Sequence, residues 1–175
     1  MLRYLFVIQP QSGRQPTFRF PSPRAAANPF PMTDTVFVLN GPNLNLLGTR
    51  EPEIYGTDTL ADIEAMLTEK ARELGLAIDF RQTNHEGVLV DWLHEARGVG
   101  AKAVLLNAAA YTHTSIALLD AIKAIELPVI EVHLSDPATR EAFRHISYVG
   151  MGAVDEVKGL GARGYTVALE KAAAL

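Results

Sequence analysis

Residues 103–133 read AVLLNAAAYTHTSIALLDAIKAIELPVIEVH. The two ends of this stretch, AVLLN (103–107) and VIEVH (129–133), are short and nearly all apolar, which is typical of parallel strands buried on both faces. Between them we expect a helix that begins at about Thr114 and ends before Pro128, because proline cannot continue a helix. A strand, a helix and a second strand in this order predict an α/β fold with a parallel sheet.

The same alternation continues on both sides of this unit. VFVLN at 36–40 reads as a strand, and LAIDFRQT at 76–83 alternates polar and apolar residues, which predicts an edge strand. The charged run VDEVK at 154–158 is the expected fifth strand, and its charges also suit an edge. Thr59 is expected to cap a helix that ends at Gly75. Together these elements predict a doubly wound five-stranded parallel sheet in a three-layer α/β/α arrangement.

Two motifs downstream of the quoted unit predict local structure. Asp136 followed by Pro137 is expected to begin a helix, because these residues favour the N-cap and first helical positions. GLGARG at 159–164 matches the dinucleotide-binding pattern but follows a charged run instead of an apolar strand, so we interpret it as a tight turn into the last helix. The loop after the first strand, NGPNLNLLG, has no lysine and no phosphate cradle. No nucleotide or flavin is therefore expected.

Composition excludes several classes of function. The 175 residues are 48% hydrophobic and 21% charged, the balance of one globular domain, and no apolar run approaches the roughly 20 residues of a membrane span. The net charge of -4 argues against nucleic acid as a partner. The absence of cysteine excludes disulfides and thiolate chemistry, and the five histidines form no H-x-x-x-H pair, so we expect no metal. A reducing, cytoplasmic location is expected.

Residues 1–33 differ from the rest of the chain. They contain four arginines, no acidic residue and six of the ten prolines, and show no helical or alternating period. We expect a poorly ordered extension before a single domain at 34–175. A secretory signal is disfavoured because no long apolar region is present, and a transit peptide fits the composition better. The favoured interpretation is that translation starts at Met32.

Polar side chains follow three of the predicted strands. Because doubly wound sheets bind ligands outside the carboxyl ends of their strands, these residues are candidates for a site. They are Asn43, Arg50, Tyr55, Asn107, His113, His133 and Ser135. The loop from Gly41 to Asp58 is long enough to predict a functional lid, although asparagines in loops often only stabilise turns.

Glu131 lies two residues before His133, so both side chains are expected on the same face of one strand. The carboxylate can then orient or charge the imidazole, and a buried ion pair without a chemical role is the alternative. Ser115 is expected to be a helix cap instead of a nucleophile, because no hydrolase elbow surrounds it.

Several separated motifs together resemble one known family. VFVLNGPNLNLLGTREPEIYG (36–56), THTS (112–115) and IEVHLS (130–135) occur in the order and at the spacing of the type II 3-dehydroquinate dehydratases. The likeness covers about residues 35–175. It implies a flavodoxin-like catalytic domain, trans-dehydration of 3-dehydroquinate to 3-dehydroshikimate through an enolate, no cofactor, a place in the shikimate pathway, and a homododecamer of trimers.

The resemblance also implies roles for individual residues. Tyr55 matches the general base, which acts as a tyrosinate, and Arg50 matches the arginine that keeps it ionised. Asn43 matches the asparagine that holds a water against the enolate oxygen. His133 matches the general acid that protonates the departing C1 hydroxyl, with Glu131 behind it.

A second set of residues matches the substrate-binding positions of the family. Arg144 matches the arginine that binds the substrate carboxylate, and Asp120 matches an aspartate contributed across a subunit interface. The other members of the set are Asn107, His113, Ser135 and the backbone of Leu134.

Some positions depart from the family pattern. Alanines stand at 108–110 where a Gly or a Pro-Gly pair is common, and their Cβ atoms are expected to bear on the substrate-facing amides. Asp136 replaces a commoner Asn, and Ile146 replaces a commoner His. The alternative function is a non-catalytic flavodoxin-like module that binds a small cyclic carboxylic acid.

Overall fold

The computed structural model describes residues 34–49 and 57–175 of the chain. The expectations for the segment 1–33, and for Arg50 and Tyr55, lie outside the described residues. Among the described residues no helix is both long and apolar enough to cross a membrane.

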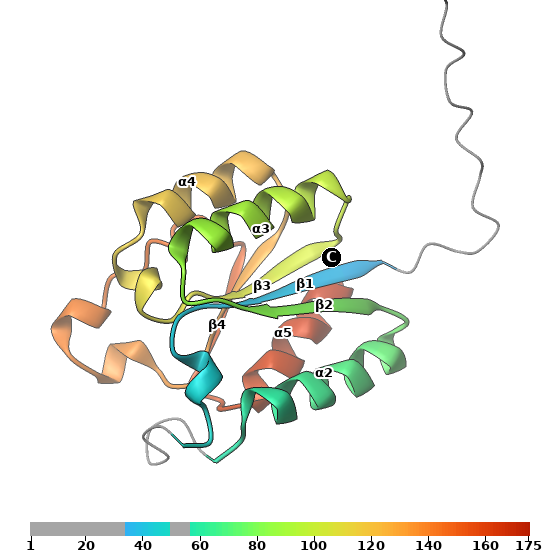
Figure 1. Cartoon of the computed structure of the whole chain (residues 1–175), viewed down its shortest axis with the longest axis horizontal. Helices are drawn as coiled ribbons and strands as arrows, with labels where there is room; N and C mark the ends of the chain where they lie inside the picture. The colour runs from blue at the N-terminus through green and yellow to red at the C-terminus, as the bar shows by residue number, and fades with distance from the viewer. Residues whose placement is uncertain (1–33, 50–56) are drawn as a thin grey trace, which may run out of the picture. The chain divides into compact units, whose positions relative to one another are not determined.

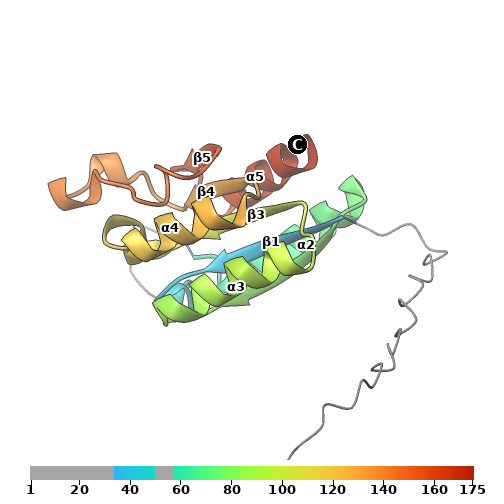
Figure 2. The ribbon, with the colours of Figure 1, turned by 90° about the horizontal axis from the view of Figure 1, so that it is seen from above.

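A five-stranded parallel sheet organises the fold, as the sequence predicts (Figure 1). The strands are β1 Thr35–Asn40, β2 Ala77–Gln82, β3 Ala103–Asn107, β4 Val129–His133 and β5 Asp155–Lys158. Their order in the sheet is β2-β1-β3-β4-β5, so the alternating strand β2 and the charged strand β5 both lie at edges. Figure 2 shows β4 between β3 and β5. The prediction of a doubly wound α/β sheet is confirmed.

In the described residues four α-helices cover the sheet, two on each face. They are α2 Leu60–Leu74, α3 Glu86–Gly98, α4 Ile116–Ile125 and α5 Arg163–Ala173. Helices α3 and α4 pack together on one face, and α2 and α5 on the other (Figure 1). Each pair buries its own apolar cluster against the sheet, and this burial of apolar surface stabilises the three-layer arrangement.

The ends of α2 follow the expected capping chemistry. The Thr59 hydroxyl accepts a hydrogen bond from the Asp62 N–H, and the Asp62 carboxylate accepts one from the Thr59 N–H. Gly75 ends the helix in the left-handed conformation, with φ of 70°. Ser115 caps α4 by accepting from the Leu118 N–H, so its expected role as a cap is also confirmed.

Two local expectations need correction or refinement. Asp136 caps only a three-residue 3₁₀ turn, Pro137–Thr139, because extended backbone at Arg140 ends the turn, so the prediction of a helix there was wrong. The loop after β1 contains a 3₁₀ turn at Leu44–Leu46. The motif 159–164 forms the expected turn between β5 and α5, with positive φ angles at its first and second glycines, Gly159 and Gly161.

The carboxyl ends of β1 and β3 form the switch point of the sheet. The chain leaves β1 toward β2 on one side, whereas β3 lies on the other side. Asn40 and Asn107, the last residues of β1 and β3, lie opposite each other in register. In sheets of this kind a ligand binds at this crevice.

Candidate active site

A cavity of about 100 Å³ lies at the carboxyl ends of β1, β3 and β4. Its walls come from the segments that follow these three strands. Seven of the residues that the sequence predicts line it, namely Asn43 after β1, Asn107 and His113 from β3 and its loop, and His133, Leu134, Ser135 and Arg144 from β4 and its loop. The structure therefore brings most of the predicted site together.

The Glu131 and His133 side chains form a buried pair on β4. Strand periodicity places both on one face, and His133 Nε2 lies 2.9 Å from Glu131 Oε1. Glu131 is 0% exposed and His133 is 7% exposed. Because a carboxylate can only accept, Nε2 carries a proton and Nδ1 is the nitrogen left for a ligand in the cavity.

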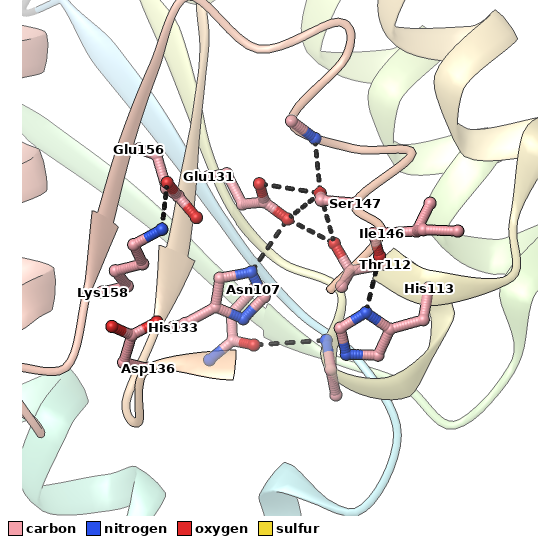
Figure 3. A network of polar contacts seen from close by, with 12 residues as sticks. Asn107, Thr112, His113, Glu131, His133, Asp136, Ile146, Ser147, Glu156 and Lys158 are labelled. Carbon is pink, nitrogen blue, oxygen red and sulfur yellow. Dashed lines mark hydrogen bonds and ion pairs between the residues drawn. The ribbon is translucent and has the colours of Figure 1, made fainter. Parts of the chain in front are cut away.

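Two hydroxyl groups also donate to the Glu131 carboxylate (Figure 3). Ser147 Oγ lies 2.7 Å from Oε1 and 2.9 Å from Oε2, and Thr112 Oγ1 donates to Oε1. Ser147 Oγ in turn accepts from the Gly150 N–H at 2.7 Å. A Cβ at Gly150 would lie 2.7 Å from Glu131 Oε2, so the loop approaches this closely only with glycine there. Sequence reasoning missed Thr112 and Ser147.

These contacts determine the charge of Glu131. Burial alone would raise its pKa, but the hydrogen bond and charge of His133, with the hydroxyls of Thr112 and Ser147, bring the pKa of Glu131 below its ordinary value. The carboxylate is therefore ionised near neutral pH. This fixed carboxylate holds the His133 ring in one orientation through its Nε2–H.

The His113 ring lies nearly parallel to the His133 ring, with 6.5 Å between their centroids. Its Nδ1 donates to the backbone carbonyl of Ile146 at 2.8 Å, so Nε2 is an acceptor in the neutral ring. Burial lowers the pKa of His113, and the charges of His133 and Arg144 lower it further, although the bond to Ile146 opposes them. Since Ile146 contributes only its carbonyl here, the departure from the family pattern at 146 leaves this contact intact.

Asn43 begins a turn through its backbone and also lines the cavity. Its backbone adopts the left-handed conformation, with φ of 65°, and its N–H donates to Asn84 Oδ1 at 2.9 Å. The Asn43 side chain does not cap the 3₁₀ turn that follows, and it lies at the cavity wall. The backbone makes the turn, so the carboxamide remains for a ligand.

Two arginines contribute positive charge to the cavity wall. Arg144 Nε donates to Glu141 Oε2 at 2.8 Å, and its guanidinium lies over the Phe143 ring. Arg140 also lines the cavity and was not predicted, because the expected helix at 136 gave no reason to place it there. An anionic group fits best near this end of the cavity.

Comparison with known proteins agrees with this geometry. The family model for dehydroquinase class II matches residues 34–173. The chain belongs to this family.

Relatives of the class II dehydroquinase family match over most of the chain. The 3-dehydroquinate dehydratase of Hyphomonas neptunium is 62% identical over 141 residues, covering 81% of this chain and 94% of the relative. That of Methylobacterium radiotolerans is 56% identical over 144 residues, covering 82% and 96%. The crystal structure of type II dehydroquinase from Propionibacterium acnes, 45% identical, covers 82% of this chain and 99% of its own, with a TM-score of 0.79.

Four residues matched to the family are not among the described residues that line the cavity. Glu131 is one of them, and it contacts His133 on the same strand. Asp120 is exposed on α4 and is not among the residues that line the cavity. Arg50 and Tyr55 lie outside the described residues. For a class II dehydroquinase the described cavity therefore contains the expected acid and, apart from Asp120, the expected substrate-binding groups, and the expected base stays a prediction.

The loop that departs from the dehydroquinase pattern has one strained residue. Ala109 adopts a φ of 50°, a left-handed conformation that costs an alanine about 1 kcal/mol. This explains why glycine suits the loop. The Ala109 N–H still donates to Asn107 Oδ1 at 3.2 Å, so the loop amide is held against the strand end.

One group of side chains in the described ranges has metal-like spacing. Single ligand atoms of Glu131, His133 and Glu156 lie within 4.8 Å of one another. Glu131 already accepts from three protein groups, and Glu156 forms an ion pair with Lys158 at 2.9 Å. The donor set is satisfied internally, so we assign no metal chemistry to it.

Proposed function

We propose that this protein is a 3-dehydroquinate dehydratase of the shikimate pathway that removes water from 3-dehydroquinate in the trans sense, through an enolate, to form 3-dehydroshikimate. The observation that carries this proposal is the buried Glu131–His133 pair, which opens on a cavity lined by polar groups and arginine. The proposed location is the cytoplasm.

The first proposed step is removal of a proton from the carbon next to the substrate ketone. Tyr55 acts as the base in its ionised form, and Arg50 stabilises the tyrosinate. A tyrosine normally ionises near pH 10. To act as an ionised base near pH 7 to 8, it requires about 3 to 4 kcal/mol of selective stabilisation of the anion. A guanidinium held against the phenolate and shielded from water would supply much of this. The electrons move onto the ketone oxygen, where Asn43 and a water it holds stabilise the enolate.

The second proposed step is departure of the C1 hydroxyl. His133 donates its Nδ1 proton to this oxygen, the C1–O bond breaks, and water leaves as the ring double bond forms. Glu131 accepts from Nε2 at 2.9 Å and so leaves Nδ1 as the nitrogen that serves the cavity. The enolate collapses back to the ketone, so the product is a conjugated enone. No cofactor is required by this balance of protons and electrons.

Binding groups around the cavity fit a small hydroxylated cyclic acid. The Arg144 guanidinium faces the substrate carboxylate, and neutral His113 accepts a hydrogen bond from a substrate hydroxyl. Asn107, Ser135 and the backbone of Leu134 complete the set. We further propose that Asp120 completes a neighbouring site in a dodecamer of trimers, which sedimentation of the purified protein would test.

The deciding experiment follows the ultraviolet absorbance of the enone after 3-dehydroquinate is mixed with the wild-type protein, the Tyr55→Phe variant and a chelator-treated sample. We expect a rapid rise that the chelator does not change and that Tyr55→Phe abolishes. A flat trace from folded wild type that still binds 3-dehydroquinate would favour the non-catalytic binding module instead.

A further inference from the structure

Beneath the cavity floor, three buried side chains form one hydrogen-bonded chain. Asn40 and Asn107 end β1 and β3, and Tyr165 of α5 inserts its hydroxyl between them. Tyr165 and Asn40 are 0% exposed and Asn107 is 3% exposed, so water does not compete for these groups. Only Asn107 of the three lines the cavity.

Backbone groups at the two ends give this chain a single direction. The carbonyl of Arg81 can only accept, so the Asn40 group that lies 3.0 Å from it is Nδ2, and Oδ1 of Asn40 faces Tyr165. At the other end the Ala109 N–H can only donate, so Oδ1 of Asn107 faces it at 3.2 Å and Nδ2 faces Tyr165. Exchanging Oδ1 and Nδ2 in either carboxamide would place two donors or two acceptors next to each other.

The Tyr165 hydroxyl joins the two carboxamides in the only way that its single proton allows. It donates to Asn40 Oδ1 at 2.6 Å and accepts from Asn107 Nδ2 at 2.9 Å. Burial raises the pKa of Tyr165 above its ordinary value, so the hydroxyl keeps this proton near neutral pH. The direction of the chain therefore does not change with pH in the working range.

We infer that Tyr165 is a positioning residue for the proposed reaction: it holds the Asn107 carboxamide in one orientation, so that the second N–H of Asn107 Nδ2 serves the cavity as a fixed donor for a substrate oxygen. This inference rests on the proposed function. A fixed donor lowers the entropic cost of binding and discriminates an oxygen acceptor from a donor at that point.

A phenylalanine at 165 keeps the ring in the apolar cluster of α2 and α5 but removes the hydroxyl that orients Asn107. The Ala109 N–H still restrains Asn107 Oδ1, so orientation is weakened and not lost. We expect the KM for 3-dehydroquinate to rise about tenfold, the size of one hydrogen bond, with kcat within about twofold of wild type.

The matched control is Leu169→Val, which lies one turn further along α5. Leu169 is fully buried in the same cluster and is not part of the polar chain. Its substitution is expected to lower the melting temperature without changing KM. A second variant, Asn40→Ala, removes the acceptor of the tyrosine hydroxyl and is expected to raise KM by a smaller factor than Tyr165→Phe.

Four outcomes are decisive. A folded Tyr165→Phe with wild-type KM, or a KM rise equal to that of Leu169→Val at the same loss of melting temperature, overturns the inference. If Tyr165→Phe does not fold, an unchanged KM in Asn40→Ala overturns the inference, and a raised KM in Asn40→Ala supports it.

The wild-type protein separates the failure of the inference from the failure of the proposed function. If wild type binds 3-dehydroquinate without converting it, the proposed function fails, and the same variants are compared by their Kd for 3-dehydroquinate. A wild type that neither converts nor binds it overturns both.

Discussion

Two acid–base pairs with identical spacing lie on different strands of the sheet. Asp79 and Arg81 on β2 are joined at 2.6 Å, and Glu131 and His133 on β4 at 2.9 Å. The side chains of the β2 pair are 33% and 22% exposed, whereas those of the β4 pair are 0% and 8% exposed. Only the β4 pair opens on the cavity.

The β2 pair is a surface clamp. Arg81 donates to Asp79 and also to Glu95 of α3, and its guanidinium lies over the rings of Phe37 and Trp92. These carboxylates raise the pKa of Arg81 further above its already high value, so the group carries a permanent charge. It ties an edge strand to a helix and has no proton to exchange near neutral pH.

The β4 pair has no such access to water. Its carboxylate depends on protein donors, and its partner is a histidine, the residue type that proteins use most often for proton transfer. An identical two-residue spacing therefore makes a partly exposed ion pair on β2 and, as we propose, a proton-transfer pair on β4, because the two pairs differ in burial and in the identity of the base.

The largest expected effect comes from removing the imidazole. His133→Asn should lower kcat by about 10²–10⁴-fold, because positioned general acids contribute rate factors of this size. Asp79→Asn, the matched change in the β2 pair, should leave kcat within about twofold. Steady-state rates from enone absorbance measure both, and equal losses in the two variants would contradict the distinction drawn between the pairs.

A smaller effect is expected when the support of Glu131 is removed. Ser147→Ala deletes a hydroxyl that donates to both carboxylate oxygens, so kcat should fall about tenfold, the size of one hydrogen bond to a charged group. Ser115→Ala, which removes a buried helix cap, is the control and should lower the melting temperature without a comparable loss of kcat. A parallel loss of rate in both variants would reduce Ser147 to a purely structural role.

The pH dependence of stability should also distinguish the buried pair. The pKa of Glu131 is lower in the folded protein than its ordinary value of 4.5, so its contribution is present above about pH 4.5 and is lost as pH falls through the folded pKa. The difference in unfolding free energy between wild type and Glu131→Gln should therefore shrink as pH falls below 4.5. Urea unfolding from pH 7 to pH 3 measures it, and a constant difference would count against this contribution.

The smallest effect is expected in the β2 pair. Arg81→Lys keeps the charge but loses the forked contacts and the ring stacking, so unfolding free energy should fall by about 1 kcal/mol or less, since water screens partly exposed pairs. The kcat should stay within about twofold. Urea midpoints and enone rates check this, and a large loss of rate would show that the edge clamp supports the site.

Strand signals and local capping could be predicted because they depend on neighbours in the chain. The apolar runs at β3 and β4, the alternation at β2 and the cap at Thr59 all appear as expected. The helix predicted at Asp136 does not form, because the residues that follow lack an apolar stripe that could be buried. The cap at Asp136 therefore begins only a short 3₁₀ turn.

The sequence by itself determined the sheet, the strand ends at which the site forms, and the Glu131–His133 pair, because period and spacing along a strand follow from backbone geometry alone. Only the tertiary structure decided which groups satisfy that pair and its surroundings. Thr112, Ser147 and Tyr165 reach the site from distant parts of the chain, the last across 125 positions to Asn40. No local pattern predicts these contacts, because a buried polar atom takes its partner from whichever segment packs against it.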